Sequence, residues 1–203
     1  MTADPMPLQE PADPEAFPDW LVPPPEGFTA DDLDRLTGLP PHTELIDGSL
    51  VFVSPQMAFH MLVIDYLRDS LKAQAPGHLH VRREMTVTLS ARQRPEPDIM
   101  IVDAAASTGL EQTTYEPQDV LLAIEVVSPD SVIRDRKRKP VLYADAGIPH
   151  FWRVENVDGR AVVYVFELDP ATGQYAPTGI YHDTLELTLP FPITLDLAEA
   201  TAP

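Results

Sequence analysis

Apolar and polar positions recur along the chain in two patterns, one typical of buried strands and one typical of amphipathic helices. The segments "PDIMIVD" and "VLLAIEVVS" are nearly continuous apolar runs, as expected for central strands that are covered on both faces. Over residues 56–77, Met, Ile and Leu recur at helical spacing until Pro76 and Gly77 end the pattern. A second helix is expected at about residues 134–146, ending at Gly147.

Shorter signals predict the remaining elements. Alternation around Asp47 and Gly48 in "HTELIDGSLVFVSP" predicts a tight β-hairpin, and "FTADDLDRLTG" predicts a short helix capped by Thr29. Further strands are expected in "HLHVRREMTVTLS", "HFWRVE", "RAVVYVFELD" and "GQYAPTGIY". The tail "LELTLPFPITLDLAEA" predicts a strand followed by a loop. The order helix, three strands, helix, strand predicts an α/β fold around one mixed sheet.

Length and composition are those of one domain with extensions. The chain has 203 residues and 44% hydrophobic residues. Residues 1–27 are rich in proline and acidic residues and predict an extended, poorly ordered arm, which leaves residues 28–203 as a single domain. The absence of cysteine excludes disulfides, thiolate metal sites and cysteine nucleophiles. Neither a membrane-spanning run nor a secretory signal pattern is present, so we expect a cytoplasmic protein with no membrane partner.

The net charge of −18 argues at face value against a nucleic-acid partner, but the charge is unevenly distributed. Residues 1–34 hold nine acidic and no basic side chains, and residues 155–203 hold eight acidic side chains and one arginine. Residues 35–154 therefore carry a net charge of only −2 and 13 of the 14 basic residues. The acidity belongs mainly to the two ends, where it favours solubility.

Glu125 lies in the middle of the apolar run "VLLAIEVVS". An ionised carboxylate in such a strand is unfavourable unless a partner or a metal ion compensates its charge. If the strand that begins after Asp98 is a neighbour, both carboxylates converge at one end of the sheet, where they offer the oxygen ligands that Mg²⁺ prefers. The alternative is that Glu125 pairs with a nearby arginine for structural reasons.

Asp135, Lys139 and Tyr143 are spaced four residues apart, which places them along one face of the second predicted helix. A lysine near a carboxylate-bound metal could orient an attacking water and stabilise the charge that develops at phosphorus. The alternative is a basic, solvated helix start or a simple phosphate-binding patch.

Four segments of the chain carry a family resemblance when they are taken together: "ELIDGSLVFVSP", "PDIMIV", "AIEVVSP" and "DRKRKPVLYADAGIPHFW". They resemble the Uma2 (DUF820) family, which is classed with restriction endonucleases in the PD-(D/E)XK nuclease superfamily. The resemblance covers about residues 42–155 and ends in the spacing Asp-x3-Lys-x3-Tyr-x3-Gly. It implies a restriction-endonuclease-like αβββαβ core with a metal site where the sheet splits. The leading hairpin and the β-rich residues 156–203 would be extensions of this core.

The resemblance also implies roles for individual residues. Asp98 would be a direct Mg²⁺ ligand (Mn²⁺ is also possible), and Glu125 would be the acidic residue of the (D/E)XK element. Val127 stands where that element has its lysine, so the lysine role passes to Lys139 on the following helix. Glu44 matches an upstream acidic position that would bind the metal through water or a second ion.

Two further residues need comment. His60 also matches a recurring position, although a lone histidine at a helix start is more often a cap or a packing residue. Pro140 disfavours helical geometry at the residue before it. If the helix begins only at Pro140, Lys137 or Arg136 could replace Lys139.

These features favour a Mg²⁺-dependent endonuclease that hydrolyses DNA phosphodiester bonds. The alternative is a catalytically inactive protein of the same fold that binds nucleic acid or a protein partner. A serine hydrolase finds no support, since the chain has no Gly-x-Ser-x-Gly and Ser128 is followed by proline. The aromatic residues of 160–195 could belong to a sugar-binding β-sandwich, but we expect them to form core or the contact of a homodimer.

Overall fold

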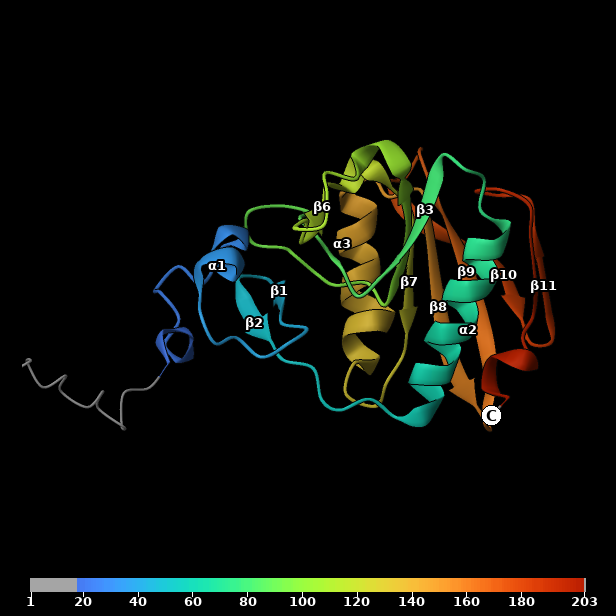
Figure 1. Ribbon diagram of the computed structural model, residues 1–203, viewed down its shortest axis with the longest axis horizontal. Coiled ribbons are helices and arrows are strands. Elements are labelled where there is room, and N and C mark those ends of the chain that lie inside the picture. The colour runs from blue at the N-terminus through green and yellow to red at the C-terminus, as the bar shows by residue number, and fades with distance from the viewer. Residues whose placement is uncertain (1–17, 203) are drawn as a thin grey trace, which may run out of the picture.

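The computed structural model describes residues 18–202, and a mixed sheet of six strands lies at its centre (Figure 1). The strand order is β10-β9-β8-β7-β5-β3. The strands span β3 (Leu79–Arg83), β5 (Ile99–Asp103), β7 (Val120–Val126), β8 (His150–Val157), β9 (Arg160–Asp169) and β10 (Gln174–Tyr181). β7 and β8 are parallel, and the other neighbours are antiparallel.

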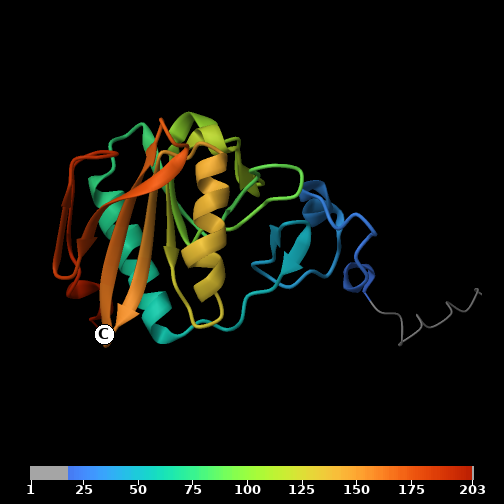
Figure 2. The ribbon, with the colours of Figure 1, turned by 180° about the vertical axis from the view of Figure 1, so that it is seen from behind.

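Two helices cover opposite faces of this sheet (Figures 1 and 2). Helix α2 (Ala58–Gln74) leads into β3, and it packs Val63, Ile64, Leu67 and Leu71 against one face. The connection between the parallel strands β7 and β8 contains the π-helical turn η4 (Arg134–Arg138) and helix α3 (Lys139–Asp145). A parallel pair needs such a crossover, because a tight hairpin joins only antiparallel strands.

Alternation along the central strands divides the interior into two apolar clusters. In β5, Ile99 and Ile101 belong to the cluster on the α2 side, whereas Met100 and Val102 belong to the cluster on the α3 side. In β7, Leu122, Ile124 and Val126 likewise face α2, and Ala123 faces α3. Successive side chains of a strand point to opposite faces. The next odd-numbered residue of β7, Glu125, therefore faces α3.

The first of the described residues, from Asp19 to Val51, form a small lobe beside the sheet (Figure 1). It contains the 3-10 turn η1 (Asp19–Leu21), helix α1 (Ala30–Arg35) and the antiparallel hairpin β1 (Glu44–Ile46) and β2 (Ser49–Val51). Asp47 and Gly48 have φ values of 55° and 76°, as a two-residue hairpin turn requires. The backbone amide and the hydroxyl of Thr29 both donate to the carboxylate of Asp32, which fixes the start of α1.

Shorter elements complete the fold. β4 (Thr86–Val87) and β6 (Thr114–Tyr115) form a small parallel pair, and β11 (Thr184–Leu187) and β12 (Ile193–Asp196) form a hairpin. That hairpin and the 3-10 turn η5 (Glu199–Thr201) pack on the α2 side of the sheet. The 3-10 turns η2 (Ala104–Ala106) and η3 (Pro117–Asp119) lie in connections.

The predicted fold class is confirmed, because α2, β3, β5, β7, α3 and β8 form the αβββαβ core around a mixed sheet. Three details differ from the prediction. "HLHVRREMTVTLS" divides into β3 and β4 at Glu84, whose φ is 51°. The second core helix opens with a π turn, and the tail contributes two strands where one was expected.

The predicted N-terminal arm lies mostly outside the described residues. Of its last ten residues, Trp20 in η1 packs edge-on against Phe52, and the carbonyl of Glu26 accepts a hydrogen bond from Arg92. The defined structure of the lobe therefore begins before residue 28. None of the helices within residues 18–202 has the length and apolar composition needed to cross a bilayer.

Buried Arg94 joins the lobe to the rest of the protein. Its guanidinium makes a two-pronged contact with Asp34 of the α1 region, at 2.7 and 3.0 Å. It also donates to the hydroxyl of Thr86 and to the carbonyl of Ala30, at 2.9 and 3.0 Å. The backbone of Arg94 bonds to that of Leu45 in β1. The hydrogen bond from Arg94 also lowers the pKa of Asp34.

We expect Arg94→Lys to lower the free energy of unfolding by about 1–3 kcal/mol, because an ammonium cannot reproduce the fork of donors and leaves buried acceptors unpaired. Urea unfolding measures the loss. Arg35→Lys is the matched control, since Arg35 pairs with Asp32 at the surface and its replacement should leave the free energy of unfolding nearly unchanged. Equal losses in the two variants would contradict the role given to Arg94.

Candidate active site

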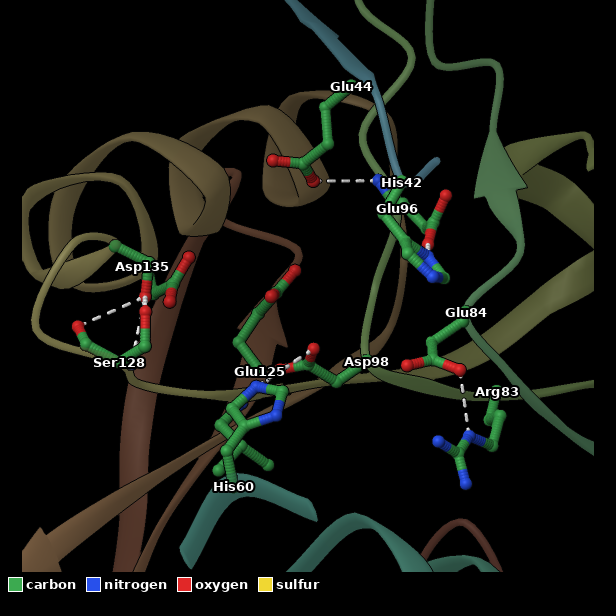
Figure 3. Close-up of polar contacts among 12 residues, drawn as sticks. His42, Glu44, His60, Arg83, Glu84, Glu96, Asp98, Glu125, Ser128 and Asp135 are labelled. Carbon is green, nitrogen blue, oxygen red and sulfur yellow. Dashed lines mark hydrogen bonds and ion pairs between the residues drawn. The ribbon is translucent and has the colours of Figure 1, made fainter. Parts of the chain in front are cut away.

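A cavity of about 370 Å³ lies where the lobe meets the sheet. Side chains from five segments point into it: the hairpin, the first turn of α2, the start of β5, the end of β7, and η4 with α3. Figure 3 shows four carboxylates directed toward one common space, with a histidine beside them. These residues are Glu44, Asp98, Glu125, Asp135 and His60.

The register of β5 and β7 brings Asp98 and Glu125 together. Ile99 is paired with Ile124 in this antiparallel ladder. Asp98 precedes Ile99 and Glu125 follows Ile124, so the two residues lie side by side at the same edge. At this point the carboxylate of Asp98 accepts a hydrogen bond from the backbone amide of Val126 at 2.6 Å. The expected convergence of the two acidic residues is therefore present.

Glu125 is 1% exposed and lies against helix α3. Its Oε2 accepts a hydrogen bond from Lys139 Nζ at 2.9 Å, and its Oε1 accepts one from the Tyr143 hydroxyl at 2.5 Å. Lys139 and Tyr143 are one helical turn apart, so both reach the same carboxylate. The partner of Glu125 is thus a lysine rather than the arginine of the structural alternative.

Lys139 holds the centre of the cluster. Its Nζ lies 2.8 Å from Glu44, 2.9 Å from Glu125 and 3.6 Å from Asp135. Its backbone is helical, with φ of −58° and ψ of −42°, so Pro140 does not displace it from the helix. Burial opposes the charged form, but the surrounding carboxylates, Glu125 first, raise the pKa of Lys139 well above its usual value.

The other two cationic alternatives lie elsewhere. Arg136 pairs with Glu155 outside the Lys139 cluster. Lys137 is exposed and does not line the cavity. The geometry therefore favours Lys139 as the counterpart of the lysine in the (D/E)XK element.

Negative charge in the cluster exceeds what Lys139 balances. Burial, together with the negative charges of Asp135, Asp98 and Glu44, raises the pKa of Glu125 well above its usual value, and Lys139 only partly offsets this effect. Burial also raises the pKa of Asp135. One oxygen of Asp135, Oδ1, is buried without a hydrogen-bond partner. A cluster of this kind favours the entry of a further cation.

His60 contacts Asp98 from the first turn of α2. Its Nε2 lies 3.2 Å from Asp98 Oδ1, and its side chain is 7% exposed. Asp98 is thus held on one oxygen by the backbone of β7 and on the other by His60. His60 therefore orients Asp98 and does not cap the helix. The sequence alone did not establish this role.

Two carboxylates of the cavity wall were not predicted. The backbone amide of Glu96 donates to Glu44 at 2.8 Å, and its side chain contacts His42 at 2.5 Å. That hydrogen bond raises the pKa of His42. Glu84 lines the same wall after the end of β3. The dipeptide "PE" directly before "PD" was the available signal for Glu96, while Glu84 lay within a segment predicted to be one strand.

The donor set fits a hard divalent cation. Glu44, Asp98 and Glu125 offer carboxylate oxygens within one cavity, and the excess negative charge favours a cation there. Within residues 18–202, no three His, Asp or Glu side chains form a ready-made metal cage. Mg²⁺ commonly binds through one or two carboxylates and keeps several waters, so such a cage is not required. The residues present are compatible with Mg²⁺, and the site itself remains a prediction.

Known proteins resemble the chain in sequence and in fold. The model of the family described as "Uma2: Putative restriction endonuclease" matches residues 30–200. The crystal structure of "a putative nuclease belonging to DUF820" from Anabaena variabilis ATCC 29413 superposes with a TM-score of 0.67 at 15% identity. The match covers 86% of this chain and 97% of that one, which shows a shared fold. No curated protein matches.

Two NucC structures are more distant. The cAAA-bound form from P. aeruginosa ATCC27853 and the apo form from E. coli MS115-1 both give a TM-score of 0.34, at 11% and 12% identity. Each match covers 62% of this chain, and 85% and 84% of the respective NucC chains. The family match, in contrast, spans most of the sequence. The chain belongs to the Uma2 family of restriction-endonuclease-like proteins.

Proposed function

We propose that the protein is a Mg²⁺-dependent endonuclease that hydrolyses phosphodiester bonds of DNA. One observation carries the proposal: the ammonium of Lys139 is buried between Glu44 and Glu125, beside Asp98 at the start of the neighbouring strand. Family membership and the nuclease-like fold support the same class of activity.

Asp98 and Glu125 would hold Mg²⁺, and Glu44 would reach it directly or through water. When bound, Mg²⁺ supplies Lewis-acid polarisation of a phosphate oxygen and lowers the pKa of a coordinated water. The chain itself fixes the carboxylates of Asp98 and Glu125. The Val126 amide and His60 hold Asp98, and Lys139 and Tyr143 hold Glu125.

Lys139 and Tyr143 act on the carboxylates and on the reacting groups. In the proposal, the Lys139 ammonium orients the attacking water and stabilises the negative charge that develops on the phosphate. Tyr143 donates to Glu125 and fixes its orientation. Burial, followed by the charge of Glu125, raises the pKa of Tyr143 well above its usual value, so this residue is a hydrogen-bond donor rather than a base.

We also propose that two copies pair through the β-rich part of the chain, as cutting both DNA strands would favour. β10 is an edge strand that pairs only with β9 among the described strands, and its Ile180 is 55% exposed. Edge strands with an apolar side chain exposed are suited to pairing with a second chain.

We expect the wild type to nick or cut supercoiled plasmid DNA with Mg²⁺ or Mn²⁺, and not with EDTA. Asp98→Asn, Glu125→Gln and Lys139→Met should each lower the rate by about 100-fold or more, because each removes a charge from the reacting centre. Gel electrophoresis of the plasmid, with single-stranded DNA as a second substrate, measures the rates.

Glu186→Gln is the matched control for the carboxylate variants, since Glu186 is an exposed residue of β11 on the far side of the sheet from α3. It should cut like the wild type. If Asp98→Asn lost cutting but Lys139→Met kept it, the lysine role would be wrong. If the wild type bound DNA without cutting either substrate, the inactive alternative would replace the proposal.

We expect Mg²⁺ to raise the unfolding temperature of the wild type, because a ligand that binds only the folded state adds about 2.7 kcal/mol at 100 times its Kd. Asp98→Asn and Glu125→Gln should lose most of this increase, and Glu186→Gln should keep it. Thermal unfolding followed by circular dichroism measures the shift without any substrate. An undiminished increase in both variants would place the metal elsewhere.

A further inference from the structure

Arg134 lies in the wall of the active-site cavity, in the π-helical turn before Lys139. Three other side chains that line the cavity can carry positive charge. Each of them lies within 3.2 Å of a carboxylate oxygen; they are His42, His60 and Lys139. Arg134, in contrast, forms no ion pair with any residue of the described part of the chain. Among the cations that line the cavity, it is the one without an ion-pair partner in residues 18–202.

The hydrogen bonds of Arg134 leave most of its donors unused. One guanidinium nitrogen donates to the backbone carbonyl of Asp130 at 3.2 Å. Its Nε is buried and has no hydrogen-bond partner among residues 18–202. Arginine has five N–H donors in a fixed fork. A buried N–H without an acceptor is unfavourable, unless a ligand supplies the acceptor.

The neighbouring cations of the same turn behave differently. Arg136 pairs with Glu155, and Arg138 pairs with Asp47 of the hairpin turn. Lys137 is exposed and does not line the cavity. Within this basic segment, unsatisfied donors and a position in the cavity wall coincide at Arg134.

The π turn explains how Arg134 and Lys139 reach the same cavity. The backbone amide of Lys139 donates to the carbonyl of Arg134, five residues earlier. In an α-helix, residues five apart point about 140° away from each other. A turn closed between residues five apart reduces this difference in direction, and such π turns are frequent at functional sites.

We propose that Arg134 binds the non-bridging oxygens of the substrate phosphodiester, an inference that rests on the function proposed above. Seven acidic side chains line the cavity, and together they would repel a phosphate. A guanidinium without an ion-pair partner among the described residues reduces this repulsion, and its fork of donors matches two phosphate oxygens. Arg134 is then a substrate-binding residue, whereas Lys139 belongs to the carboxylate cluster.

The test is equilibrium binding of a fluorescein-labelled DNA duplex, followed by fluorescence anisotropy with Ca²⁺ in place of Mg²⁺. Arg134→Met should weaken binding by about 10- to 100-fold, as expected for charge-assisted hydrogen bonds to phosphate. Lys137→Met removes the same charge from the same turn, outside the cavity, and should weaken binding by no more than about threefold. Arg134→Lys should fall between wild type and Arg134→Met.

Urea unfolding shows whether Arg134→Met is folded, and Arg134→Lys provides the test if it is not. A larger loss of binding in Arg134→Met than in Lys137→Met, together with a higher KM for cutting, supports the inference. Equal losses in the two variants overturn it, and so does wild-type binding in Arg134→Met and Arg134→Lys.

If the wild type binds DNA through Arg134 but cuts none, the nuclease proposal fails while the phosphate site stands. If the wild type cuts and Arg134→Met keeps its KM, the phosphate site alone fails.

Discussion

One buried ammonium among an excess of carboxylates is the interaction on which the site depends. Lys139 contacts Glu44 from the lobe, Glu125 from the sheet and Asp135 from its own helix. Removing one partner of a buried ion pair typically costs about 3–5 kcal/mol, because the remaining charge stays buried and uncompensated. The contact therefore fixes the lobe, the sheet and α3 relative to one another, and a single lysine still leaves the cluster negative.

The acidity of the chain acquires a structural meaning in this setting. Asp34, in the acidic first 34 residues, pairs with Arg94 of the more basic central region, and Asp47 of the hairpin turn pairs with Arg138 within that region. These pairs hold the hairpin that carries Glu44 over the start of α3. Part of the acidity near the N-terminus is thus used to attach the lobe, in addition to any effect on solubility.

Much of the site could be predicted because it follows from local periodicity. Alternation in β7 places Glu125 on the α3 side, and the spacing of Lys139 and Tyr143 directs both at it. Three residues of the cavity wall were missed. The position of Glu96 depends on the path of a proline-flanked segment, that of Glu84 on its own left-handed backbone after β3, and that of Arg134 on a π turn. None of these leaves a periodic signal in the sequence.

The π turn also brings to the cavity a second cation, which a regular helix would direct elsewhere. In the proposal, Lys139 neutralises buried carboxylates and acts on the attacking water and on the charge that develops at phosphorus. Binding the substrate phosphate before the reaction is a separate task, for which a second cation is suited. Lys139 is surrounded by carboxylates, which raise its pKa and keep it charged. The extra residue of the turn brings Arg134 to the same cavity without a carboxylate partner among the described residues. In the proposed arrangement, a metal ion and Lys139 would balance the carboxylates, and Arg134 would remain available to the substrate.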